Sequence, residues 1–226
     1  MMGTPVLSVN RLSVALPAGA DRSHALQDIS FSLNAGETCC VVGESGSGKS
    51  VLAMTVMGLL ARELRVSEGE VRLQQESLLG LDDARWRALR GRAMGMVFQE
   101  PMTALNPLFS IGDQIAEVLQ LKRGMSAADA WQHTIELLTD TGIPEPERRA
   151  SSFPHQLSGG QRQRIMIAMA LILDPALLIA DEPTTALDVT TQSQILKLIK
   201  ELQLSHGTGV LFITHDFGVV AEIADQ

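Results

Sequence analysis

The chain has 226 residues, of which 45% are hydrophobic and 19% charged, so it can bury a core and is not a disordered chain. Its net charge of −8 argues against a protein-wide surface for nucleic acid. The two cysteines, Cys39 and Cys40, are adjacent in a predicted strand and would point to opposite faces, so we expect free thiols and a reducing, cytoplasmic compartment. We see no signal peptide and no apolar stretch long enough to span a bilayer.

The first part of the chain is predicted to be rich in β-structure. Val6–Leu16 and His24–Leu33 have the pattern of strands separated by a turn-rich stretch. Glu37–Val42 is short, apolar and partly β-branched, which indicates a buried strand. Residues 51–57 contain no helix breaker and predict a helix, and Gly69–Gln74 predicts a further strand.

The middle of the chain changes character. Asp82–Arg90 predicts a helix and Ala93–Phe98 a short apolar strand. Residues 100–160 then contain turns and apolar residues at helical spacing, without a convincing strand. We therefore expect a helical lobe inserted into an α/β core.

The last part of the chain returns to alternating elements. We expect a helix at about 159–173, a strand at Leu177–Ala180, an amphipathic helix around 195–202 and a strand at Gly209–Thr214. Strands that alternate with helices indicate parallel crossover units and a wound sheet. Functional groups of such sheets gather at the carboxyl ends of the strands.

The stretch 43–50 reads Gly-Glu-Ser-Gly-Ser-Gly-Lys-Ser between a predicted strand and a predicted helix. This context favours a phosphate-binding loop over a chance glycine-rich turn. Glycines let consecutive N–H groups point at one anion, the lysine reaches the β- and γ-phosphates, and the last serine can ligate Mg²⁺. The residues expected to bind nucleotide are Gly43, Glu44, Ser45, Gly46, Ser47, Gly48, Lys49, Ser50 and Val51.

Four polar residues follow the ends of later predicted strands. Asp181 suits the Mg²⁺ shell, together with Ser50 and Gln99, and Glu182 suits orienting or deprotonating the attacking water. An acidic loop is the plain alternative for the carboxylate pair, and the phosphate loop in the same sheet makes it the weaker one. Gln99 and His215 would mean little alone, but their strand-end positions make them catalytic candidates.

Leu157–Gln161 reads Leu-Ser-Gly-Gly-Gln before a predicted helix. Ser158 can cap this helix, and the glycines expose its N–H groups, which makes a second anion site. One nucleotide does not need two such sites in one chain, so we expect Ser158, Gly159, Gly160 and Gln161 to serve the nucleotide of another subunit. A generic helix start is the alternative.

Together these strings resemble the nucleotide-binding domain of ATP-binding cassette (ABC) proteins over essentially the whole chain. The matching motifs are Walker A (Gly43–Ser50), the Q-loop (Gln99), the LSGGQ string (Leu157–Gln161), Walker B (Ile179–Glu182), the D-loop (Ala186–Asp188) and the switch histidine (His215). Longer strings such as Phe98–Pro107 and Ala180–Val189 resemble those of the subfamily that energises oligopeptide, dipeptide, nickel or glutathione import.

The resemblance implies a P-loop NTPase core with a mainly parallel sheet, an N-terminal antiparallel β region and an inserted helical lobe. It implies one domain over 1–226, with a core at about 1–98 and 162–226 and a lobe at about 99–161. Family domains continue past the switch histidine with further strands, so we expect a chain that ends at Gln226 to be truncated. The family's adenine-stacking aromatic is missing, and Leu16, or else His24, falls near its position.

The resemblance also implies an ATPase that hydrolyses ATP with Mg²⁺ and powers an importer of small peptides or related solutes. Two cassettes, identical or different, would sandwich two ATP molecules head to tail. The partners would be a second cassette, transmembrane permease subunits and, indirectly, a solute-binding protein, with no nucleic acid. The chain would lie in the cytoplasm, peripheral on the inner face of the plasma membrane, with Glu100–Asn106 as a coupling segment.

Three other hypotheses stay open at this stage. A non-transport ABC ATPase of DNA repair or translation usually carries zinc modules, coiled coils or basic arms, and none is visible here. A nucleotide-binding regulator without turnover would be expected to lack Glu182 or His215, and both are present. A P-loop kinase would not explain Leu157–Gln161.

Overall fold

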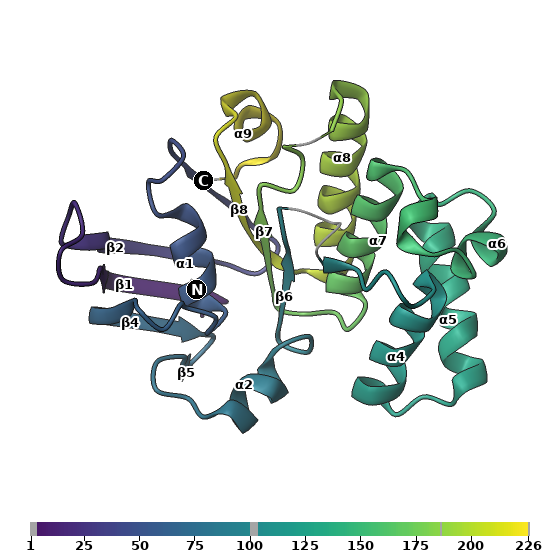
Figure 1. Cartoon of the computed structure of the whole chain (residues 1–226), viewed down its shortest axis with the longest axis horizontal. Coiled ribbons are helices and arrows are strands. Elements are labelled where there is room, and N and C mark those ends of the chain that lie inside the picture. The colour runs from purple at the N-terminus through teal and green to yellow at the C-terminus, as the bar shows by residue number, and fades with distance from the viewer. Residues whose placement is uncertain (1–3, 100–103, 186, 226) are drawn as a thin grey trace.

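The structure is a computed structural model that describes residues 4–99, 104–185 and 187–225 (Figure 1). Most of the expected coupling segment Glu100–Asn106 and Ala186 of the D-loop string therefore lie outside the described residues. Of the helices in these ranges, none combines the length and hydrophobicity that crossing a bilayer requires.

Two sheets are present in the described residues. The antiparallel sheet has the order β2-β1-β4-β5, with β1 (Leu7–Ala15), β2 (His24–Leu33), β4 (Arg65–Leu73) and β5 (Glu76–Ser77). The parallel sheet has the order β3-β8-β7-β6, with β3 (Thr38–Val42), β6 (Met94–Val97), β7 (Leu177–Asp181) and β8 (Gly209–Thr214). This architecture confirms the expected α/β fold with a parallel core sheet and an N-terminal antiparallel region.

The helices of the described residues fall into three groups according to the hydrophobic core that they share. The first group is α1 (Lys49–Val56) with the short α2 (Asp83–Leu89). The second group comprises α4 (Ile111–Arg123), α5 (Ala127–Asp140), α6 (Pro146–Ala150) and the 3₁₀ turn η1 (Pro154–Gln156). The third group comprises α7 (Gly159–Leu171), α8 (Val189–His206) and α9 (Phe217–Ile223).

Side-chain alternation along β8 shows how the layers pack. Leu211 and Ile213 face a core shared with α1 and the antiparallel sheet, whereas Val210 and Phe212 face a core shared with α7, α8 and α9. Both faces of the parallel sheet are therefore covered, which explains why its strands are continuous apolar runs.

The adjacent cysteines obey the same alternation. Cys39 packs in the core on the α1 side, and Cys40 packs against the core on the α8 side. Both thiols are free, as expected. Burial raises the pKa of each thiol to about 11, so both stay protonated at neutral pH.

The helices α4, α5 and α6 share a separate core with residues on both sides of them in the chain. This core includes Leu105, Ile111, Leu138 and Leu157, and also Ile165 of α7. In Figure 1 these helices lie at the end of the molecule opposite the antiparallel sheet. The boundaries of about 99–161 for a helical lobe remain a prediction.

Two local expectations were incomplete. The strand expected at Gly69–Gln74 begins earlier, at Arg65, because the exposed residues at its start lack the apolar signature of a buried strand. The two-residue strand β5 was not expected.

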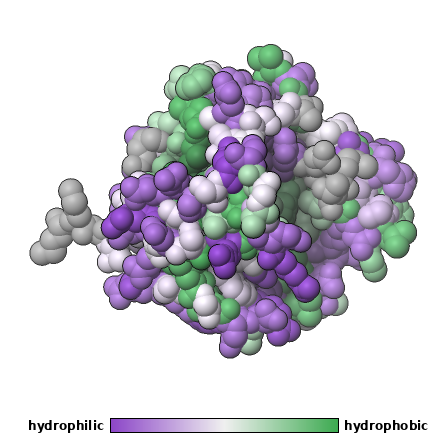
Figure 2. All heavy atoms as spheres, turned by 60° about the vertical axis from the view of Figure 1, so that its left-hand side comes forward, coloured by the Kyte–Doolittle hydropathy of each residue, from purple (hydrophilic) through white to green (hydrophobic). Residues whose placement is uncertain are grey.

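The face that carries the N-terminal strands has hydrophobic side chains scattered among hydrophilic ones (Figure 2), as suits a sheet with one solvated side.

Candidate active site

The loop between β3 and α1 packs closely against itself and β2. Gly46 and Gly48 have positive φ angles of 81° and 101°, which residues with a side chain rarely adopt. A Cβ atom at Gly48 would lie 2.5 Å from the carbonyl oxygen of Ala25, and one at Gly43 would lie 2.8 Å from Oγ of Ser47. The glycines therefore provide both the turn and the close approach, and they bring backbone N–H groups to the start of α1, where anions bind.

Lys49, the first residue of α1, folds its side chain back over this loop. Its Nζ donates hydrogen bonds to the carbonyl oxygens of Gly43 at 2.7 Å and Glu44 at 2.9 Å. The same Nζ lies 3.9 Å from Oε1 of Glu182. Only 8% of the residue is exposed, and a buried ammonium group needs such partners. The cation is thus held between the glycine loop and the end of β7.

Parallel pairing brings the expected residues to one edge of the sheet. β8 lies between β3 and β7, and β7 lies between β8 and β6. Gly43, His215 and Glu182 directly follow three of these strands, and Gln99 comes two residues after the fourth. The N–H of Glu182 donates to the carbonyl oxygen of Ile213 at 2.9 Å, which extends the ladder past β7.

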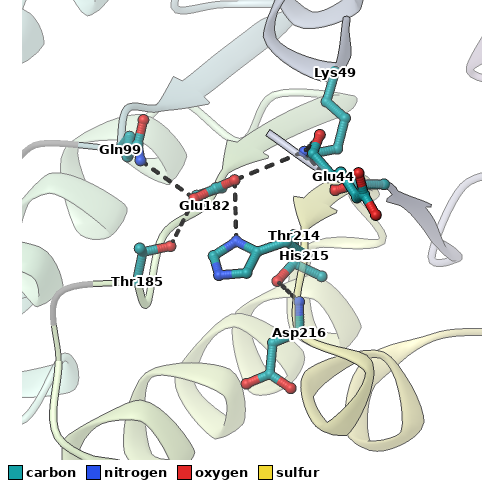
Figure 3. Close-up of polar contacts among 9 residues, drawn as sticks. Glu44, Lys49, Gln99, Glu182, Thr185, Thr214, His215 and Asp216 are labelled. Carbon is teal, nitrogen blue, oxygen red and sulfur yellow. Dashed lines mark hydrogen bonds and ion pairs between the residues drawn. The ribbon is translucent and has the colours of Figure 1, made fainter. Parts of the chain in front are cut away.

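The carboxylate of Glu182 is the centre of this arrangement (Figure 3). Its Oε1 lies 3.2 Å from Nδ1 of His215. Its Oε2 accepts hydrogen bonds from Nε2 of Gln99 at 3.2 Å and from the Thr185 hydroxyl at 2.9 Å. With Lys49, four side chains from four segments fix its orientation, and its own side chain is 15% exposed. The structure therefore brings Gln99, Glu182 and His215 together as expected.

Glu182 also has an unusual backbone conformation. Its φ of 47° is in the left-handed region, which is uncommon for residues other than glycine. Such conformations cost about 1–3 kcal/mol and persist where the surroundings impose them. The turn directs the Glu182 side chain to Lys49 and His215.

Asp181, one residue earlier, is buried, with 5% of its surface exposed. Its Oδ1 has no hydrogen-bond partner among the described residues. Burial raises the pKa of this carboxyl and the charge of Glu182 adds to the rise, whereas a hydrogen bond from Ser50 and the charge of Lys49 oppose it. A buried carboxylate with a free oxygen beside a serine hydroxyl is a suitable pair of ligands for Mg²⁺.

An open pocket of about 990 Å³ covers the glycine loop and the strand ends. Every expected residue from Gly43 to Val51 lines it except Ser47, and so do Gln99, Glu182 and His215. The pocket is large enough for a nucleotide. Its size and its polar groups make it the principal candidate site of the described residues.

Sequence reasoning missed five residues of this pocket as site candidates: Arg22, Ala25, Val42, Thr185 and Phe217. Arg22 lies in a turn-rich loop and Phe217 starts α9, so only the folded chain brings them near the glycine loop. Thr185, three residues after Glu182, could have been suggested by its place in the same strand-end turn. Of the two expected adenine positions, Leu16 lines the pocket and His24 does not.

The Ser158–Gln161 segment lies outside this pocket. Ser158 caps α7: its Oγ accepts from the N–H of Gln161 at 3.3 Å, and its own N–H donates to Oε1 of Gln161 at 3.0 Å. A Cβ atom at Gly160 would lie 2.7 Å from Cγ2 of Thr191, so this glycine lets α7 approach α8. The structure thus confirms the helix cap, and the expected nucleotide contacts of this segment remain a prediction.

Known proteins resemble this chain in sequence. The family model described as "ABC transporter" matches residues 26–185. A putative peptide import ATP-binding protein of Brucella ovis is 50% identical over 100% of this chain and 69% of its own length. The dipeptide transport ATP-binding protein DppD of Bacillus subtilis is 48% identical over 98% of this chain and 66% of its own.

Solved structures agree with this similarity. A dimeric structure of MJ0796, a bacterial ABC transporter cassette, has a TM-score of 0.83 at 33% identity and covers 95% of this chain and 90% of that one. A post-hydrolysis dimer of the same ATP-binding cassette, bound to ADP and Pi, has a TM-score of 0.81 at 32% identity and covers 94% and 89%. By sequence and by fold, the chain belongs to the ABC transporter family.

Proposed function

We propose that this chain is the ATP-binding and ATP-hydrolysing subunit of an ABC importer of small peptides or related solutes. The observation that carries the ATPase proposal is the Glu182 carboxylate, held by Gln99, Thr185 and His215 in a pocket that also contains Lys49. The names of the similar proteins support the solute class: the relatives from Brucella ovis and Bacillus subtilis are named for peptide import and dipeptide transport.

In the proposed reaction, the glycine loop and Lys49 hold the phosphates of ATP. Glu182 orients a water molecule and accepts its proton as the water oxygen attacks the γ-phosphorus, which gives ADP and inorganic phosphate. His215 holds the γ-phosphate and shares the carboxylate of Glu182, so it fixes the relative positions of base and phosphate. Gln99 positions the same carboxylate from the opposite side.

The residues present fit a bound Mg²⁺ ion. Ser50 and Asp181 would hold it, with Gln99 as a further ligand. This assignment is supported by Oδ1 of buried Asp181, which has no hydrogen-bond partner among the described residues. When bound, Mg²⁺ supplies positive charge that neutralises the phosphate oxygens of ATP. Within the described residues, no three His, Cys, Asp or Glu side chains cluster as a metal site, which suits an ion held partly by its substrate.

The proposed site is completed by a second cassette. Ser158, Gly159, Gly160 and Gln161 of one copy would contact the nucleotide of the other, which is supported by the position of this segment outside its own pocket. The dimeric structures of a similar cassette also support this arrangement. Permease subunits would bind to the helices α4–α6 and hold the cassette at the inner face of the membrane.

Two alternative functions are less well supported. A regulator that binds ATP without hydrolysing it would not need a carboxylate fixed in position as that of Glu182 is. A non-transport ABC ATPase of DNA repair or translation would be expected to carry a basic surface, and the net charge is −8. No specific contact in the described residues favours either function.

The Glu182→Gln variant tests the proposed reaction. We expect it to bind ATP with wild-type affinity, to release phosphate at least about 100-fold more slowly and to accumulate as an ATP-bound dimer. Phosphate release and size-exclusion chromatography with ATP measure these effects. Glu222→Gln, an exposed change on α9, is the matched control. Normal turnover by Glu182→Gln would exclude Glu182 as the catalytic base.

A further inference from the structure

The pocket has two unlike ends. The end at the strand termini carries the polar residues already described. The other end is lined by Leu16, Arg22 and Ala25, which belong to the β1–β2 hairpin. If the phosphates of a nucleotide lie on the glycine loop, its base points away from the strand termini, toward this hairpin.

Arg22 is positioned at this end by a hydrogen bond of its side chain and by the closure of the loop that carries it. Its Nη2 donates a 2.7 Å hydrogen bond to the carbonyl oxygen of Gly46 in the glycine loop. The loop that carries it is closed at its base, where the N–H of Leu16 donates to the carbonyl oxygen of Ser23 at 3.0 Å. The guanidinium group is therefore tied to the phosphate-binding loop, and the rest of the exposed side chain remains open to the pocket.

None of the three hairpin residues that line the pocket is aromatic. A planar guanidinium group can take the place of an aromatic ring, because it stacks on the face of a nucleobase and contributes a cation–π attraction. Leu16, beside it, supplies an apolar surface. Leu16, Arg22 and Ala25 have no side-chain acceptor that could read the amino group of adenine.

We propose that Arg22 is the platform for the nucleobase and that Leu16 completes it, so that the chain accepts GTP nearly as well as ATP. This inference rests on the proposed nucleotide binding. Stacking on a guanidinium plane depends on the π-face that every base offers, and it therefore discriminates little between purines. At an exposed site such a contact is worth about two- to fivefold in affinity.

The test compares three ligands by calorimetry with the full chain and Mg²⁺: ATP, GTP and inorganic tripolyphosphate. We expect ATP and GTP to bind within about threefold of each other and more tightly than tripolyphosphate. Arg22→Ala should weaken both nucleotides about fivefold and leave tripolyphosphate within twofold. Arg11→Ala, an exposed arginine of β1 outside this pocket, is the matched control.

Two further variants separate stacking from other roles of Arg22. Arg22→Lys keeps the charge and loses the planar face, so it should resemble Arg22→Ala. Leu16→Phe in the Arg22→Ala background should recover the lost nucleotide affinity by aromatic stacking.

Several results would overturn the inference. Equal losses for tripolyphosphate and ATP would make Arg22 a phosphate or loop-stabilising residue. Unchanged ATP affinity in Arg22→Ala, or strong preference for ATP over GTP, would also contradict it while the proposed ATP binding stands. Failure of the wild-type chain to bind both ATP and tripolyphosphate would refute the proposed function as well.

Discussion

The strand-end site and the Ser158–Gln161 segment are both built to meet anions, but their degree of assembly differs. At the strand ends, one carboxylate is held by side chains from four separate segments. At Ser158, the Ser158 hydroxyl and the Gln161 side-chain oxygen each accept a hydrogen bond from the other residue's backbone N–H, in a helix cap that is exposed at its first residue. The first region is organised by the fold of one chain, whereas the second is a capped helix start, which we propose contacts the nucleotide of a second copy.

Because of this difference, we expect substitutions in the two regions to have effects of different size. A change at Lys49, which holds the glycine loop beside the strand-end site, should affect nucleotide binding by the single chain. A change at Ser158 should affect only what two chains do together.

The largest effect on binding is expected from Lys49→Ala. The variant loses a nearly buried cation that faces the glycine loop, and a charge-assisted hydrogen bond contributes about 1.5–3 kcal/mol, so we expect ATP affinity to fall at least about tenfold. Calorimetric titration with ATP measures this. Lys197→Ala, an exposed lysine of α8, is the control. Unchanged affinity in a folded Lys49→Ala chain would contradict the account of this loop.

A smaller and more selective effect is expected from Ser158→Ala. ATP binding by the single chain should stay within twofold, because Ser158 is outside the pocket, while steady-state turnover should fall about tenfold. Loss of the cap alone costs about 1 kcal/mol of stability. Ser126→Ala removes an equivalent serine cap from α5 and should cost similar stability without loss of turnover. Equal turnover in the two variants would remove Ser158 from the site.

The smallest effect concerns stability. Because the pKa of Asp181 is raised in the folded chain, its contribution to stability is fully present below the ordinary carboxyl pKa and is lost as the pH rises through the folded-state value. At neutral pH the buried carboxylate therefore costs stability. Asp181→Asn should raise the melting temperature of the ligand-free chain by a few degrees, while the gain in ATP affinity from Mg²⁺ is lost.

Asp188→Asn should change the melting temperature at neutral pH in the opposite direction, that is, lower it. Hydrogen bonds from Thr191 lower the pKa of Asp188, so its stabilising effect is present at neutral pH and is lost as the pH falls through the folded-state value. Melting curves between pH 3 and pH 7.5 should show the two variants departing from the wild type in opposite directions at neutral pH. A lower melting temperature for Asp181→Asn would contradict the burial cost.

How well the sequence predicts these regions depends on whether the relevant signal is local. The apolar runs of β3, β7 and β8 are local signals, and parallel order then places Glu182 near His215 without further information. Arg22 lacks such a signal, because its approach to Gly46 depends on the hairpin returning over the glycine loop. The left-handed backbone of Glu182 also lacks a local signal, because residues other than glycine rarely adopt a positive φ.

Mixing two defective chains tests the central claim, that each site combines the glycine loop of one copy with Ser158 of another. Lys49→Ala impairs only the glycine loop and leaves the helix start at Ser158 intact. Ser158→Ala impairs only the helix start and leaves the glycine loop intact. In an equimolar mixture half of the dimers are mixed, and each has one intact site, so turnover should recover to about a quarter of the wild-type rate. Turnover equal to the mean of the two separate variants would contradict a site shared between copies.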